Sequence, residues 1–79
     1  MVVPTVLITG WQPGLLKVSM TQSIQARARI GLREAKSVTD RVLDGEHVAL
    51  DLPDAESAAS LAHELRGLGA TVVVRDDPA

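Results

Sequence analysis

The clearest pattern in the chain is the segment GLREAKSVTDRVLDG, residues 31–45, which predicts one amphipathic helix together with both of its ends. Apolar and small side chains recur at helical spacing, and charged residues fill the opposite face. Gly31 precedes the periodic segment, whereas Asp44 and Gly45 follow it, and glycine just past the last turn commonly ends a helix. We therefore predict a helix over residues 32–43. Its expected apolar arc consists of Leu32, Ala35, Val38, Thr39, Val42 and Leu43.

The segment before this helix, residues 15–29, allows two interpretations. Residues 17–21 alternate as a strand would, but other apolar side chains in the segment repeat every four residues. Because these repeats form a narrow, continuous face at about 100° per residue, we favour a helix. The expected face consists of Leu16, Met20, Ser23, Ile24, Arg27 and Ala28.

The flanking segments predict three strands. Residues 2–9 are rich in β-branched and aliphatic side chains and stop at Gly10, and residues 11–14 carry a turn signal. Residues 47–52 alternate, with Val48, Leu50 and Leu52 on one side, as a half-buried strand does. Residues 71–75 provide the third strand.

A third helix is expected between the last two strands. Asp54 suits its N-cap, because an aspartate oxygen can accept from the free N–H groups of the first turn. Gly67 and Gly69 are expected to end it. Its predicted apolar face consists of Ala55, Ala58, Ala59, Leu61, Ala62 and Leu65.

The expected order is strand, helix, helix, strand, helix, strand, within a single domain over residues 1–79. Such a domain is most simply an α+β two-layer sandwich, with three strands in one sheet and three helices on one face. The chain is expected to be ordered from about residue 2 to residue 75, and residues 76–79 are expected to form a polar tail.

Composition excludes several classes of function. A 79-residue chain with 46% hydrophobic residues can form one small core, and its formal net charge of −2 is spread over interleaved acids and bases. That balance provides no electrostatic footprint for nucleic acid or for an anionic membrane. The apolar runs are far shorter than the roughly 20 residues that cross a bilayer. With no secretory signal visible, we expect a cytoplasmic location.

No enzyme, cofactor or metal signature is recognisable. There is no cysteine, and His47 and His63 have no partner at ligand spacing, so both are expected to face solvent. The turn between Gly10 and Gly14 follows a strand as in a dinucleotide-binding fold, but Leu16 occupies the third glycine position.

Trp11, the single aromatic residue, has two possible roles. It could lie over the end of the sheet and complete an aliphatic core, or it could be an exposed anchor for a partner. We favour the packing role, because a small core without other aromatic residues needs its volume.

The segment Ile30-Gly31-Leu32-Arg33-Glu34-Ala35-Lys36 resembles the Gly-Leu-Lys-Glu-Ala-Lys motif in the C-terminal domain of the bacterial ribosomal stalk protein. Lys17 and Val18 stand where that family carries its Lys-Val helix start, and residues 61–74 resemble its last helix, Gly-Ala turn and final strand. The resemblance extends from about residue 5 to residue 75. It implies an antiparallel three-stranded sheet with three helices on one face, and a helix over residues 15–29.

The resemblance also implies a binding surface on the first two helices, which in the stalk family recruit translational GTPases. Gln22 and Gln25 depart from the family pattern, because basic residues occupy these positions there. The same charges also fit an ordinary solvated helix face, with Gly31 as a simple break between helices. The expected partner-binding residues, glutamines included, are Lys17, Val18, Ser19, Thr21, Gln22, Gln25, Gly31, Arg33, Glu34 and Lys36.

The sequence thus favours a non-catalytic domain that binds a translation-related protein through its first two helices. The alternative is an adaptor that presents a substrate to a protease or another machine, since the adaptor of the Clp protease has a similar fold. A self-assembling or accessory module is a third possibility.

Overall fold

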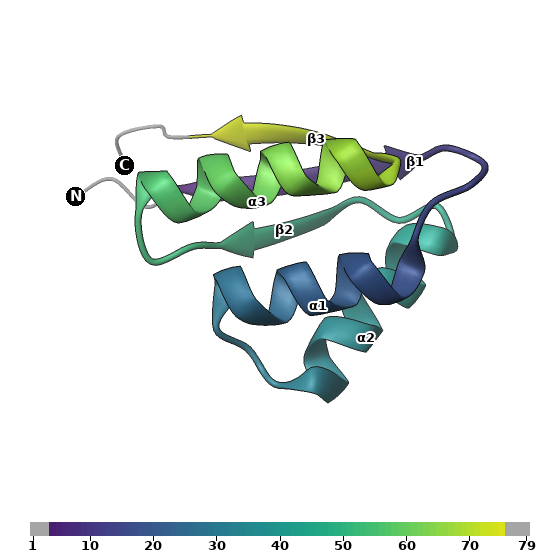
Figure 1. The fold of residues 1–79 in the computed structure, drawn as a ribbon, viewed down its shortest axis with the longest axis horizontal. Helices are drawn as coiled ribbons and strands as arrows, with labels where there is room; N and C mark the ends of the chain where they lie inside the picture. The colour runs from purple at the N-terminus through teal and green to yellow at the C-terminus, as the bar shows by residue number, and fades with distance from the viewer. Residues whose placement is uncertain (1–3, 76–79) are drawn as a thin grey trace.

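The computed structural model describes residues 4–75, which form one sheet and three helices (Figure 1). The predicted strand start at residues 2–3 and the predicted tail at residues 76–79 lie outside the described residues. The elements in order are β1 (Thr5–Trp11), α1 (Lys17–Ala28), α2 (Leu32–Leu43), β2 (Val48–Asp51), α3 (Ala55–Leu68) and β3 (Ala70–Arg75).

The sheet is antiparallel, with β1 in the centre between β2 and β3. Val6 lies opposite Leu50 of β2 and Val74 of β3. A bulge in β1 at Thr9 interrupts the pairing with β3, which resumes at Gly10 and Trp11. The extra residue allows β1 to continue past Gly10, where the sequence predicted its end.

The three helices cover one face of the sheet, and the core lies between the two layers (Figure 1). Alternation along β1 buries Val6 and Ile8 beneath the helices, whereas Leu7 lies half-buried on the other face. The predicted α+β two-layer sandwich is confirmed, including its element order. The largest fully buried side chains are Val6, Ile8, Met20, Ile24, Val42, Leu61 and Leu65.

Two leucines that the sequence assigned to the core are exposed instead. Leu16 is 57% exposed because α1 begins only at Lys17, so Leu16 is its N-cap, and the neighbouring Leu15 enters the core in its place. Leu32, in the first turn of α2, is 48% exposed because it lies at an open groove between the helices. The predicted inward positions of Ala55 and Ala59 on α3 are also wrong, since both alanines face solvent.

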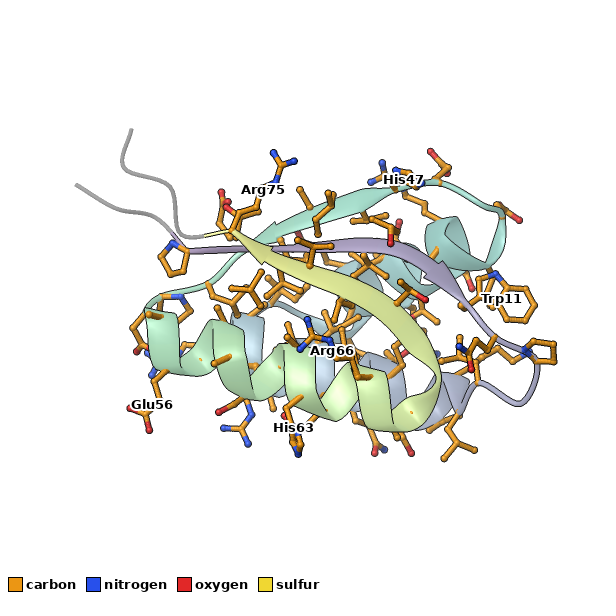
Figure 2. The ribbon with its side chains drawn as sticks, turned by 90° about the horizontal axis from the view of Figure 1, so that it is seen from above. Trp11, His47, Glu56, His63, Arg66 and Arg75 are labelled. Carbon is orange, nitrogen blue, oxygen red and sulfur yellow. The ribbon has the colours of Figure 1, made fainter. Side chains whose placement is uncertain are left out.

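The prediction that Trp11 packs into the core is wrong as well. Trp11 is 43% exposed and lies at the end of β1, opposite Ala70 of β3 (Figure 2). Ala70, the partner of Trp11 across the sheet, and Leu15 belong to the buried core instead. The aliphatic side chains alone are therefore sufficient to close it.

Asp54 caps α3 as predicted, and the cap lowers the pKa of its carboxyl group. The backbone N–H of Ser57 donates to Asp54 Oδ1 at 2.7 Å. This bond, with one from the Ser57 hydroxyl and a weaker attraction to Arg29, lowers the pKa of Asp54 below its ordinary value of 3.8.

A pH-dependent contribution to stability follows from this cap. A carboxylate whose pKa is lower in the folded than in the unfolded state stabilises the fold above the unfolded pKa. The contribution is lost as the pH falls through the folded pKa. We expect urea unfolding between pH 7 and pH 3 to show that the free energy of unfolding decreases less with acid in Asp54→Asn than in the unaltered chain. The reason is that asparagine caps the helix without titrating. Parallel loss of stability in both proteins would contradict this role of the charge.

Candidate protein-binding surface

Two buried threonine hydroxyls hold α1 and α2 together. Thr21 Oγ1 and Thr39 Oγ1 lie 2.8 Å apart, and each also lies near the carbonyl oxygen one turn earlier in its own helix, at 3.0 Å from Lys17 O and 3.2 Å from Ala35 O. Each hydroxyl has one proton, so one threonine donates to the other, which donates to its own helix. Among the described residues, no buried side-chain polar atom lacks a hydrogen-bond partner.

Above these threonines lies an open groove of about 250 Å³ between the helices, which we call the α1–α2 groove. Val18 of α1 and Leu32 of α2 present its apolar surface, with 73% and 48% of each residue exposed. Exposed aliphatic side chains that converge on a groove are typical of a surface that a partner covers. The complete lining is Lys17, Val18, Thr21, Gln22, Leu32, Lys36, Thr39 and Asp40.

The charge at the rim of the groove is opposite to that of the whole chain. Lys17 and Lys36 are the two lysines of the sequence, and both line the α1–α2 groove, whereas Asp40 is its single carboxylate. The lining therefore carries two positive charges against one negative charge, on a chain with a formal net charge of −2. Such a local positive field attracts acidic groups.

A second hollow of about 500 Å³ continues from the groove across the outer side of α2. It shares Leu32, Lys36 and Asp40 with the α1–α2 groove, so the two form one continuous surface. Its remaining lining is polar or charged and consists of Arg33, Ser37, Arg41 and Asp44. The apolar centre of the surface thus lies in the groove, and the hollow on α2 extends its charged margin.

The structure brings together six of the ten residues that the sequence assigned to partner binding. Those lining the α1–α2 groove are Lys17, Val18, Thr21, Gln22 and Lys36, and Arg33 lines the adjoining hollow. Thr21 is only 7% exposed, so it forms the floor of the groove and not an outer contact. The others lie outside both linings: Ser19 and Gln25 are half-buried, and Gly31 and Glu34 are exposed.

Three groove residues are absent from the predicted set: Leu32, Thr39 and Asp40. Leu32 and Thr39 belonged to the apolar arc of α2 and were therefore assigned to the core. The position of Leu32 beside Gly31, in the first turn of a helix, was the available signal that it could project past the core. No signal in the sequence placed Asp40 opposite α1.

Residues 4–75 contain no group of three or more His, Asp or Glu side chains that could hold a metal ion. His47 and His63 both face solvent, as predicted, and lie on opposite sides of the molecule (Figure 2). No helix in the described part of the chain has the length and apolar character needed to cross a membrane.

No protein-family model matches this sequence, and a comparison with curated proteins finds no significant match.

Proposed function

We propose that this chain is a protein-binding domain without catalytic activity, and that it binds an acidic amphipathic helix of a translation-related protein in the α1–α2 groove. The observation that carries the proposal is the exposed pair Val18 and Leu32, which line the groove together with the chain's two lysines. A translational GTPase is the proposed partner, and such a partner places the domain in the cytoplasm.

The apolar part of the groove suits transient binding. Fully burying one valine or leucine side chain contributes about 1.5–3 kcal/mol, and Val18 and Leu32 are already partly covered. Two such side chains provide an anchor but not the large apolar core of a permanent interface. An amphipathic helix fits this geometry, because side chains spaced at three and four residues can enter a groove along one face.

The charged part of the groove determines the preferred sign of the partner. Lys17 and Lys36 attract carboxylates over several ångströms and so accelerate encounter with an acidic helix. Gln22 lines the same groove without a charge, which makes its field weaker than one with a third cation there. Binding should therefore be fast, modest in affinity and sensitive to salt.

The proposal of a translational partner is supported by the motif of residues 30–36 and by Lys17 and Val18 at their matching distance from it. The α1–α2 groove contains Lys17, Val18, Leu32 and Lys36, which belong to these two motifs.

The proposal can be tested by an amide NMR titration of the domain with a purified translational GTPase. We expect shifts in the residues that line the α1–α2 groove. Val18→Ala combined with Leu32→Ala should weaken binding by at least about tenfold, since the anchor is lost. Lys17→Ala and Lys36→Ala should each weaken it about two- to fivefold and flatten its dependence on salt, as expected for exposed charges.

A matched control is Val73→Ala, which truncates another exposed valine on the open face of the sheet. It should leave the affinity unchanged. Shifts confined to the sheet, or equal weakening by Val73→Ala, would contradict the groove as the binding site. A spectrum that stays unchanged at high GTPase concentration would exclude this class of partner.

A further inference from the structure

Strand β3 is a free edge of the sheet, since the strand order places it beside β1 alone. Figure 1 shows it along one margin of the molecule, with no described element beyond it. Its sequence, ATVVVR, is rich in β-branched residues and carries one charge, at Arg75. Strands of this composition readily pair with another strand unless something blocks the edge.

Two hydrogen bonds show which backbone groups of β3 point outward. The Thr9 hydroxyl donates to the carbonyl oxygen of Thr71, so the Thr71 carbonyl faces β1. The carbonyl oxygen of Val72 instead accepts from Arg66 of α3. Because consecutive residues of a strand direct their N–H and C=O groups to opposite sides, Val72 and Val74 present theirs at the free edge.

The side chain of Arg66 donates a hydrogen bond to the outward carbonyl oxygen of Val72. Its Nη2 lies 3.1 Å from the Val72 oxygen, and the side chain extends from the last turn of α3 to β3 (Figure 2). A strand that pairs with β3 needs the Val72 carbonyl as an acceptor, and a guanidinium at that position competes for it. The opposite edge, β2, has only four residues and offers a shorter ladder.

We propose that Arg66 keeps this domain monomeric by blocking β3, and that β3 pairs antiparallel with β3 of a second copy when Arg66 is removed. Another copy presents the same strand already ordered within its sheet, so pairing costs less conformational entropy than the capture of a disordered peptide. This inference concerns the sheet edge and is independent of the α1–α2 groove.

The outward groups limit the registers that such a pair can adopt, and one of these registers pairs Val72 with Val74. With the two-fold axis at Val73, Val72 of one copy lies opposite Val74 of the other, and both present free backbone groups once Arg66 is removed. Thr71 then lies opposite Arg75, so no like charges meet, and β-branched residues oppose one another. This axis is perpendicular to the sheet, so both helical layers lie on the same side and the two sheets become continuous.

Sedimentation velocity over a range of concentrations tests the proposal. We expect the Arg66→Ala variant to dimerise at a concentration at least about tenfold lower than the unaltered chain. This change is equivalent to about 1.4 kcal/mol. Arg66→Met, which keeps the aliphatic stem over the helix but has no donor, should behave alike. Arg41→Ala removes the same charge from an exposed ion pair on another element and should remain monomeric.

A second measurement locates the interface. In the Arg66→Ala dimer, the Val74 amide should exchange more slowly with solvent, whereas the Val73 amide already faces β1 and should not change. Adding Val73→Lys puts two lysines opposite each other at the axis and should restore the monomer. The proposal is overturned if Arg66→Ala and Arg66→Met remain monomeric, form larger assemblies, or dimerise without protecting Val74 and without a response to Val73→Lys.

Discussion

Leu61→Ala is expected to lower the free energy of unfolding by about 2–5 kcal/mol. Leu61 is fully buried in α3, the helix that packs against both β3 and α1. Truncation removes apolar contacts and leaves a cavity that neighbouring aliphatic side chains fill only in part. The total stability of a 79-residue chain is roughly 4–12 kcal/mol, at about 0.05–0.15 kcal/mol per residue. This one change can therefore remove a large share of it.

Thermal and urea unfolding measure the effect, and the melting temperature should fall by more than about 8 °C. The same truncation at an exposed site, Leu16→Ala, is the control. Leu16 lies outside the core, so the loss there should stay within about 0.5 kcal/mol. Equal losses at the two sites would show that the core does not lie between α3 and the sheet.

Gly69→Ala is expected to destabilise the fold by about 1–3 kcal/mol. Gly69 ends α3 with a φ of 109°, in the left-handed region that L-residues avoid. An added Cβ would lie 3.2 Å from the backbone Cα of Leu15, which cannot rotate away as a side chain could. Both backbone strain and this close approach act at the turn that joins α3 to β3.

Gly67→Ala provides a control of the same chemical size two residues earlier. Gly67 lies inside α3, and an added Cβ there meets no atom within 4 Å. Alanine should therefore stabilise the helix by about 0.5–1 kcal/mol. Urea unfolding should show opposite signs for the two substitutions, and a shared sign would contradict the conformation of the α3–β3 turn.

Prediction from sequence was best where most of the apolar side of an element contacts the core. The amphipathic period predicted α2 with its observed bounds, because most of its apolar arc contacts the core. It was less accurate in α1, where Thr21 is buried although a polar residue was expected outside. A threonine hydroxyl can enter the interior only if it finds a partner, and Thr39 comes from another helix.

The residues of the candidate surface also differ in whether the sequence could predict them. Lys17, Val18 and Lys36 could be named from the motif, since their types and spacing are visible along the chain. Leu32 could not be assigned to the surface, because an apolar residue in the arc of an amphipathic helix is usually buried. Its exposure depends on how α1 packs against α2, which local sequence does not encode.

The number and order of the elements, the apolar side of most of them and the absence of cysteine chemistry can all be derived from the amino-acid sequence. The folded chain was needed to show that the two lysines share one groove, that Thr21 meets Thr39, and that Arg66 reaches the free edge of β3. The physical reason is that periodicity records which side of a helix or strand avoids water. Which distant side chain covers that side depends on packing between elements far apart in the chain.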